Sequence, residues 1–315
     1  MINIALLGSG GSMPMPGRFL SSLLMSYKGR KILVDCGEGT QVSMKNMNSG
    51  FKSIDIICIT HVHGDHIFGL PGLISTIGNS GRTEPITIIG PEGIKDIMNS
   101  IVTLVPYLSY DINVIENPPP ILGISFSTNG LKVEEAEEHS NEDIQMSILE
   151  LDHSCPCLGY SFYIVRRPKF CVQKAISNQV PKAIWSRLQN GEFIVYENHM
   201  YEPDMVLGEK RKGIKLSYIT DTRPINTILD FINESDLFIC EGTYGDNEDI
   251  EKAIKNKHMT FAEAAGLAYR GKVEELLLTH FSPSMDEPNL YTTNALEIFQ
   301  NTKIGYDGFT KELCF

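Results

Sequence analysis

The sequence predicts a layered α/β fold, and three observations carry that prediction. Short apolar runs typical of strands open the chain, at Ile2–Leu7, Ser22–Tyr27, Lys31–Cys36 and Ile54–Ile59. Helical stretches then alternate with further strands. Several of the strands end at a histidine, an aspartate or a glutamate. Because functional side chains collect where strands end in layered α/β proteins, these strand ends predict one shared site.

The later elements follow the same pattern. Residues 91–102, PEGIKDIMNSIV, predict a helix with a proline near its first turn. Residues 260–271, TFAEAAGLAYRG, predict an amphipathic helix with a threonine N-cap and a glycine at its end. Three apolar runs each end at a polar residue: Ile214–Thr220 at Asp221, Leu237–Cys240 at Glu241, and Leu276–Thr279 at His280.

Composition limits the class of protein. A chain of 315 residues with 42% hydrophobic and 21% charged residues is typical of a globular protein with one large domain. No apolar run approaches the roughly 18 residues of a membrane span, and the first residues lack the basic region of a signal peptide, so we expect no membrane partner and no export. The seven scattered cysteines favour a reducing compartment, and hence the cytoplasm. The CPC at 155–157 lacks CxxC spacing and is interpreted as ordinary reduced cysteines.

Residues 59–73, ITHVHGDHIFGLPGL, hold three of the eight histidines of the chain within six positions. A solvated turn explains such a concentration poorly. In an extended segment, alternate side chains point the same way, so His61 and His63 can converge on one cation. A tight turn at Gly64 would direct Asp65 and His66 toward a second cation. Imidazole and carboxylate donors without a thiolate suit zinc best. Manganese and iron also accept these donors, but less exclusively.

Distant segments complete the predicted ligand set. His153 in ELDHSCP, Asp221 in YITDTRP and His280 in LLLTHFSP each follow an apolar strand and precede a loop. Any one of them alone would be interpreted as a hydrogen-bonded histidine or a capping aspartate. Together with the HxHxDH segment upstream, they predict a site for two adjacent metal ions, which hydrolytic sites place about 3.5–4 Å apart.

The motifs resemble those of the ribonuclease Z family of tRNA 3′-processing endonucleases, within the metallo-β-lactamase superfamily. The resemblance runs from Gly8 to Ser282 and rests on GSGGSMP, VDCGEGTQ, THVHGDHIFGLPGL, ITDTRP, CEGTYGD, HMTFAEAA and LTHFS. HxHxDH alone indicates only the superfamily, whereas VDCGEGTQ and HMTFAEAA are more specific. The resemblance implies a four-layer αββα sandwich over residues 1–315, with a protruding arm inserted at 166–207.

The resemblance also implies a role for each site residue. His61, His63 and His153 would hold one zinc ion, Asp65, His66 and His280 the other, and Asp221 would bridge the two. Asp65 would in addition accept a proton from the attacking water. His258 would act as general acid, with Glu241 orienting its ring. Asp35 and Glu38 are interpreted as groups behind the ligands or as turn formers. The expected products are a tRNA with a 3′-hydroxyl, cut after the discriminator nucleotide, and a trailer with a 5′-phosphate.

The charge distribution bears on the substrate. The chain carries a net charge of −12, which by itself disfavours nucleic acid. Residues 161–220, however, hold ten Lys and Arg against five acidic residues. In the family, the arm in this segment clamps the elbow of the tRNA, and a homodimer lets the arm of one subunit grip a tRNA cut by the other. Lys182 and Ala183 replace a glycine-proline turn of that arm. We expect Trp185 to be buried in the arm, although it could stack on RNA.

Three functions remain open from the sequence. The first is an endonuclease acting on precursor tRNA, with no DNA partner expected. The second is a binuclear-zinc hydrolase of small phosphodiesters, esters or lactones, and the third is an RNA-binding protein without activity. The complete ligand set and His258 argue against the third function. The basic segment favours the first over the second.

Overall fold

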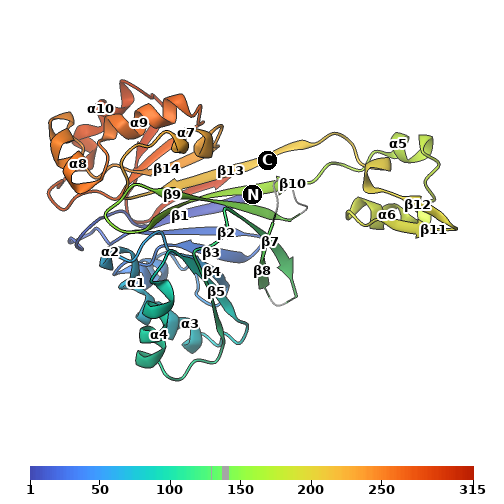
Figure 1. The fold of residues 1–315 in the computed structure, drawn as a ribbon, viewed down its shortest axis with the longest axis horizontal. Coiled ribbons are helices and arrows are strands. Elements are labelled where there is room, and N and C mark those ends of the chain that lie inside the picture. The colour runs from blue at the N-terminus through green and yellow to red at the C-terminus, as the bar shows by residue number, and fades with distance from the viewer. Residues whose placement is uncertain (129, 137–141) are drawn as a thin grey trace.

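Two facing β-sheets form the middle of the molecule, and helices cover the outer face of each sheet (Figure 1). This computed structural model describes residues 1–128, 130–136 and 142–315. One apolar cluster fills the space between the sheets. A second cluster lies between the first sheet and its helices, and a third lies between the second sheet and its helices. The predicted αββα sandwich is therefore confirmed.

The first sheet is built mainly from the N-terminal part of the chain. Within the described residues it has seven strands in the order β17-β1-β2-β3-β4-β5-β6. Their bounds are β1 Ile2–Gly8, β2 Ser22–Tyr27, β3 Arg30–Val34, β4 Ile54–Cys58, β5 Ile86–Gly90, β6 Ile112–Glu116 and β17 Phe309–Leu313. The helices on this side are α1 Thr40–Asn46, α2 Gly64–Ile67, α3 Leu70–Asn79 and α4 Ile94–Leu104.

The second sheet has eight strands within the same ranges, in the order β16-β15-β14-β13-β10-β9-β7-β8. Their bounds are β7 Ile121–Ser127, β8 Gly130–Glu135, β9 Ile144–Leu151, β10 Cys157–Arg166, β13 Arg211–Ile219, β14 Leu237–Glu241, β15 Leu276–Thr279 and β16 Thr302–Ile304. The helical segments on this side are α7 Thr227–Ile232, η3 Asn247–Asp249, α8 Ile250–Asn256, α9 Phe261–Arg270, η4 Pro288–Tyr291 and α10 Thr292–Leu296.

The strands that matter for the site run in one direction within each sheet. β3, β4 and β5 are parallel, and so are β13, β14 and β15. Their carboxyl ends therefore meet at one edge of each sheet, where ligands bind in open α/β sheets. The predicted strands match the observed ones to within three residues, with the largest difference at the start of β13. The sequence predicts a tight turn at Gly64. In the structure Gly64 is the first residue of the short helix α2, which also contains Asp65 and His66.

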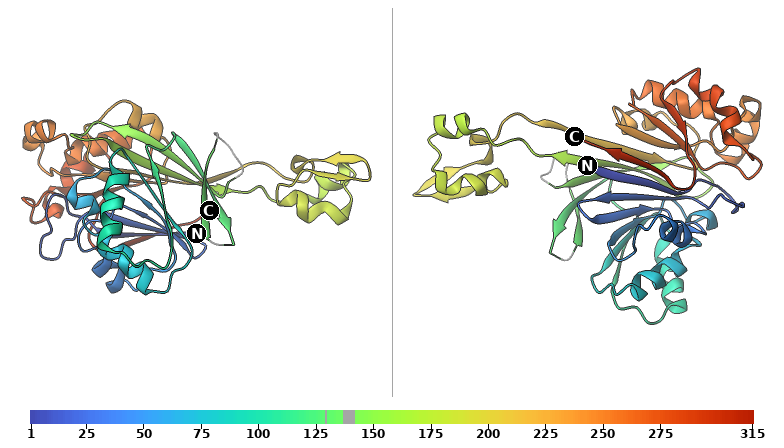
Figure 2. Two further views of the ribbon diagram at one scale, coloured as in Figure 1. Left: turned by 60° about the horizontal axis from the view of Figure 1, so that its bottom comes forward. Right: turned by 180° about the vertical axis from the view of Figure 1, so that it is seen from behind.

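An arm extends from the end of the sandwich that lies opposite α2 and α8 (Figures 1 and 2). β10 and β13 pair as far as Arg166 and Arg211 and then leave the body. We call residues 166–169 and 210–212 the stalk, and residues 170–209 the arm head. The head contains α5 Val172–Ser177, η1 Lys182–Ile184, α6 Trp185–Gln189, β11 Ile194–Tyr196, β12 His199–Tyr201 and η2 Pro203–Met205.

The arm head has an apolar core of its own. Ala175, Ile184, Leu188 and Val206 are buried in it and form a cluster separate from those of the body. Trp185 packs at the edge of this cluster, and its indole N–H donates to the carbonyl of Val180 at 2.9 Å. Trp185 is half-buried, so the expectation that it is buried in the arm holds only in part. No helix in the described part of the chain has the length and apolarity needed to cross a bilayer.

A buried ion network joins the two sheets on the side away from the strand ends. Asp55 of β4 receives hydrogen bonds from Arg30 and from the backbone N–H of Leu131 in the second sheet. Arg82, which is fully buried, contacts the same carboxylate at 2.8 Å. Arg82 also donates to the backbone carbonyls of Lys52 and Ile54. Asp55 therefore pairs with two guanidinium groups and connects strands from both sheets.

Replacing Asp55 should destabilise the whole sandwich. In Asp55→Ala, the buried Arg82 loses its counter-ion, and breaking a buried pair in this way costs about 3–5 kcal/mol. Chemical denaturation followed by circular dichroism measures the change in the free energy of unfolding. Arg187→Ala, which removes an exposed ion pair with Glu192 in the arm head, is the control and should cost less than about 1 kcal/mol. Equal losses in the two variants would contradict this role of Asp55.

Candidate metal centre

The candidate ligands lie just beyond the carboxyl ends of strands. His61 and His63 follow β4, and Asp65 and His66 belong to α2 directly behind them. His153 follows β9, Asp221 follows β13 and His280 follows β15. Asp221 and His280 have left-handed backbone conformations, with φ of 49° and 59°. Non-glycine residues adopt this conformation at a cost of about 1–3 kcal/mol, and such conformations recur at functional sites.

The first group of donor atoms, which we call cluster 1, comes from three histidines. His63 Nδ1 lies 3.0 Å from His61 Nε2 and 3.3 Å from His153 Nε2. Zinc–nitrogen bonds of about 2.0–2.1 Å in a tetrahedral site place the donors about 3.3–3.4 Å apart. Cluster 1 therefore has the spacing of a metal site.

The second group, cluster 2, combines two histidines and two carboxylates. Nε2 of His66 and Nε2 of His280 are 3.2 Å apart. Asp65 Oδ2 lies 3.5 Å from the first and 3.4 Å from the second nitrogen. Asp221 Oδ1 lies 3.4 Å and 3.1 Å from the same two atoms. The two ring nitrogens lie 3.1–3.5 Å from each other and from both carboxylate oxygens, which fits a tetrahedral cation as well as cluster 1 does.

Asp221 connects the two clusters. Its Oδ1 faces cluster 2, whereas its Oδ2 lies 3.6 Å from His61 Nε2 and 3.8 Å from His153 Nε2 in cluster 1. Burial raises the pKa of this carboxyl, but His280, His66 and His61 outweigh burial and hold the pKa well below its usual range. The group is therefore a carboxylate at neutral pH, with one oxygen available to each cluster.

In cluster 2, hydrogen bonds hold the outer ring nitrogens of the histidines. His66 Nδ1 contacts Asp35 Oδ2 at 2.8 Å, and Asp35 also accepts from the backbone N–H of Thr60 at 2.8 Å. His280 Nδ1 contacts the hydroxyl of Thr243 at 3.1 Å. Such partners fix the ring so that Nε2 faces the metal. Asp35 thus forms a hydrogen bond with a candidate ligand, as predicted for a group behind the ligands. The side chain of Glu38 is exposed, and its backbone carbonyl accepts a hydrogen bond from the N–H of Leu20.

In cluster 1 the outer nitrogens are held in the same way. His61 Nδ1 lies 3.1 Å from the hydroxyl of Thr60. His153 Nδ1 lies 3.3 Å from the carbonyl oxygen of Lys257, a residue with φ of 56°. The Lys257 ammonium group contacts the carboxylate of Asp152, the residue before His153, at 2.7 Å. Lys257 therefore joins a candidate ligand directly to the loop that carries His258.

The pair formed by Glu241 and His258 lies beside both clusters. Glu241 is fully buried at the end of β14, and its two oxygens lie 3.3 and 3.2 Å from His258 Nδ1. Glu241 also accepts from the backbone N–H of Thr222 and of Met259. Burial lowers the pKa of the His258 imidazole, but the Glu241 carboxylate, with help from Asp221, raises it to about 9. With Nδ1 turned toward Glu241, Nε2 is the nitrogen that can deliver a proton.

Several contributing residues carried no signal in the sequence. The backbone N–H of Ser12 donates to Asp65 Oδ2 at 2.6 Å. Arg223 pairs with Glu263 and donates to the carbonyl of His258, which ties the His258 loop to the capping box of α9. An open cleft at the clusters is lined by Ser12, His63, Asp65, His153, Ser154, Asp221, Lys255, Asn256, Lys257 and His258. The structure thus brings every predicted site residue together, and their roles as ligands and acid stay predictions.

Known proteins match the chain from end to end. A ribonuclease Z from Alkaliphilus oremlandii is 63% identical over 99% of both chains, and one from Clostridium beijerinckii is 60% identical over 100% of this chain and 99% of its own. The chain belongs to the ribonuclease Z family. Residues 2–201 also belong to the family described as Anti-Pycsar protein Apyc1. That family match ends before Asp221, His258 and His280, whereas the ribonuclease Z matches extend over all three residues.

Solved structures show the same fold. The short form of human tRNase Z has a TM-score of 0.68 at 23% identity, covering 99% of this chain and 100% of its own. The metallo-beta-lactamase fold protein YhfI from Bacillus subtilis has a TM-score of 0.67 at 18% identity with the same coverage. Both resemblances extend over the whole sandwich, including the strands that end at the clusters.

Removing Asp221 should weaken both clusters at once. In Asp221→Ala each cluster loses one donor, so metal content should fall from about two ions per chain to well below one in dilute chelator. Elemental analysis of the purified protein measures this. The control is Asp230→Ala, which removes an exposed carboxylate on α7 that belongs to neither cluster, and should retain both ions. A variant that lost only one ion would show that Asp221 serves a single cluster.

Proposed function

We propose that this chain is a metal-dependent endoribonuclease that processes the 3′ end of tRNA. The single observation that carries the proposal is the geometry at Asp221: two four-donor clusters share one carboxylate, and a histidine–glutamate pair stands beside them. The identity of 63% to a ribonuclease Z over the whole chain supports the same activity. We also infer that residues 1–315 form one domain, with 166–207 inserted as the arm.

We infer that the two clusters hold two zinc ions. His61, His63 and His153 would bind one ion, Asp65, His66 and His280 the other, and Asp221 both. Nitrogen and oxygen donors at tetrahedral spacing suit zinc, and manganese or iron less exclusively. When bound, such ions polarise a phosphoryl oxygen and make water more acidic.

Asp65 would accept the proton of the attacking water. Burial raises the pKa of its carboxyl, but hydrogen bonds with His280 and His66 outweigh burial and hold the pKa well below its usual range. The group is therefore a carboxylate at neutral pH. The N–H of Ser12 holds Oδ2 from the side of the glycine-rich loop, which keeps the carboxylate directed at the clusters.

His258 would protonate the leaving group. The oxygen of the attacking water bonds to phosphorus, the bond from phosphorus to the 3′-oxygen of the discriminator nucleotide breaks, and the proton on His258 Nε2 passes to that oxygen. Because the pKa of His258 is raised to about 9, the ring carries this proton at neutral pH. Glu241 stabilises the charged ring and fixes its orientation. The products are a tRNA with a 3′-hydroxyl and a trailer with a 5′-phosphate.

Replacing His258 should slow the cleavage of two substrates to different extents. His258→Ala should slow cleavage of precursor tRNA about 10²–10⁴-fold, because its leaving oxygen is basic and needs the proton. Hydrolysis of bis(p-nitrophenyl) phosphate should change far less, because its leaving group needs little protonation. Single-turnover assays on both substrates measure the two effects. His199→Ala, at an exposed histidine of the arm head, is the control. Equal slowing of both substrates would rule out the general-acid role.

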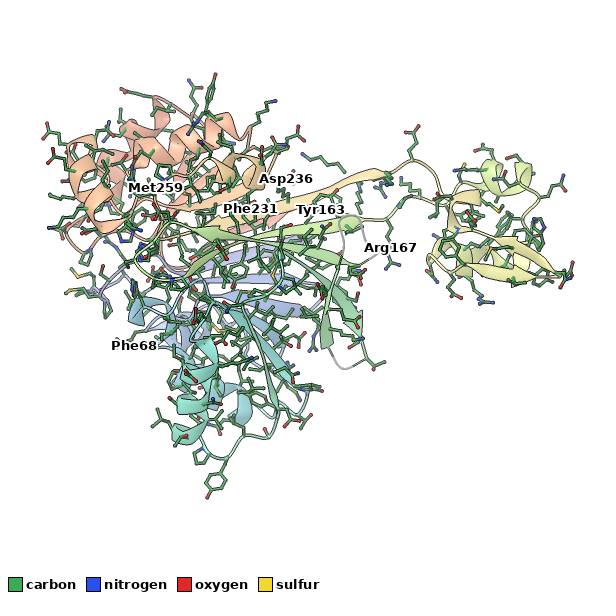
Figure 3. All side chains as sticks on the ribbon, viewed as in Figure 1. Phe68, Tyr163, Arg167, Phe231, Asp236 and Met259 are labelled. Carbon is green, nitrogen blue, oxygen red and sulfur yellow. The ribbon has the colours of Figure 1, made fainter. Side chains whose placement is uncertain are left out.

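The stalk is the strongest candidate for binding RNA phosphates. Six of its seven residues are basic and none is acidic, whereas the arm head has three basic residues against five acidic ones. The positive charge counted over residues 161–220 is thus concentrated where the arm leaves the body, near Arg167 (Figure 3). The stalk basic residues are Arg166, Arg167, Lys169, Lys210, Arg211 and Lys212.

Two matched triple variants test this assignment. Lys169, Lys210 and Arg211 are replaced by Gln in the stalk variant, and Lys174, Lys182 and Arg187 in the head variant. Each removes three charges, but only the stalk variant should weaken binding of precursor tRNA strongly. Its salt dependence should also become shallower, by about one unit of slope for each phosphate that the protein no longer neutralises. If both variants bound and cleaved tRNA like the parent chain, hydrolysis of a small phosphodiester would become the better proposal.

We further propose that the protein acts as a homodimer in the cytoplasm. The seven free cysteines suit a reducing compartment. The arm extends from the end of the sandwich remote from α2 and α8, so the arm and the clusters of one chain lie at opposite ends (Figures 1 and 2). A second chain would allow one arm to hold a tRNA cut at the other site. Light scattering should give twice the mass of the chain, and a monomer with full activity on precursor tRNA would refute the dimer.

A further inference from the structure

The thiol of Cys155 lies among the donors of cluster 1. Its Sγ and the ring nitrogens of His61, His63 and His153 are all within 4.8 Å of one another. Cluster 2 has no sulfur within that distance among the described residues. The two clusters therefore differ in chemistry, because only the first has a soft donor at hand.

The backbone of the turn between β9 and β10 holds this thiol in place. His153 lies two residues before Cys155, so both side chains leave the same short turn. Pro156 follows and restricts Cys155 to an extended conformation. The backbone of Val62, between His61 and His63, also lies close to the sulfur. Cys155 is half-buried, and its neighbours His153 and Ser154 line the cleft.

The neighbouring cysteine shows that this placement is particular to Cys155. Cys157 is buried at the start of β10, and its thiol contacts the carbonyl of Thr220 at 3.7 Å. Cys171 lies in the arm, and Cys314 is exposed near the end of the chain. The remaining cysteines, Cys36, Cys58 and Cys240, are buried. None of these six belongs to a group of candidate metal donors within the described residues.

We propose that Cys155 is a sulfur ligand of the cation held by cluster 1, in addition to its three histidines and Asp221. The proposal rests on the metal centre proposed above and concerns only the chemistry of one position in it. As the sulfur–metal bond forms, the thiol releases its proton to solvent. The sulfur makes cluster 1 the preferred position for thiophilic ions such as zinc and cadmium, whereas cluster 2 offers only nitrogen and oxygen.

Cobalt(II) reports sulfur ligation directly. Cobalt-loaded parent protein should show an intense sulfur-to-cobalt charge-transfer band in the near ultraviolet. Cys155→Ser and Cys155→Ala should both lack this band while retaining two cobalt ions, because the histidines and carboxylates remain. Cys171→Ser, a control at a cysteine outside the clusters, should keep the band. Two variants at Cys155 are needed because the serine hydroxyl is itself a weak ligand.

Affinities give a second readout. Cys155→Ala should lower the affinity of one of the two sites for cadmium about tenfold or more, since even changes to the partners of ligands alter affinity about 10–100-fold. Its affinity for manganese should not change. A parent protein that binds two cobalt ions without the band, or a band that survives in both Cys155 variants, would overturn the sulfur ligand alone. Failure to bind cobalt at all would overturn the metal centre with it.

Discussion

The arrangement of the site depends on one buried carboxylate that faces two groups of imidazoles. Asp221 places Oδ1 within 3.1–3.4 Å of two histidine nitrogens and Oδ2 within 3.6–3.8 Å of two others. A buried carboxylate is costly unless it is paired, and a cluster of histidines is equally costly if several rings carry a charge. Cations at both clusters would resolve the two costs together, since they neutralise Asp221 and bind the imidazoles in their uncharged form.

The fold brings the side chains of this site together and orients them. Parallel strands in each sheet end at one edge, so residues distant in the chain arrive at the same place. Left-handed conformations at Asp221 and His280 then turn these side chains toward the partner sheet. Behind the ligands, Asp35 and Thr243 hold the outer ring nitrogens. Backbone conformation and hydrogen bonds therefore orient the candidate ligands, as a hydrolytic centre requires.

Much of this could be predicted from sequence because it rests on local pattern. Strand ends followed by His61, Asp221 or His280 identify a shared edge without knowledge of the sheet order. The contribution of Lys257 could not be found in this way, because its backbone carbonyl contacts His153 and any residue has such a carbonyl. The role of Arg223 depends on a hydrogen bond to the His258 carbonyl that only the folded chain creates.

The arm shows a different limit of sequence reasoning. A charge count over residues 161–220 identifies a basic segment correctly but does not locate the charge in space. The pairing of β10 with β13 ends at Arg166 and Arg211, which brings the two basic stretches together as a stalk below an acidic head. The pairing register, and not composition, thus determines where this positive charge lies.

The most direct test of the shared carboxylate itself is anomalous diffraction from crystals of the zinc-loaded protein, recorded on both sides of the zinc absorption edge. Two zinc peaks are expected, one among His61, His63 and His153 and one among Asp65, His66 and His280, with one oxygen of Asp221 against each. A single peak, or two peaks that do not share Asp221, would contradict the binuclear centre.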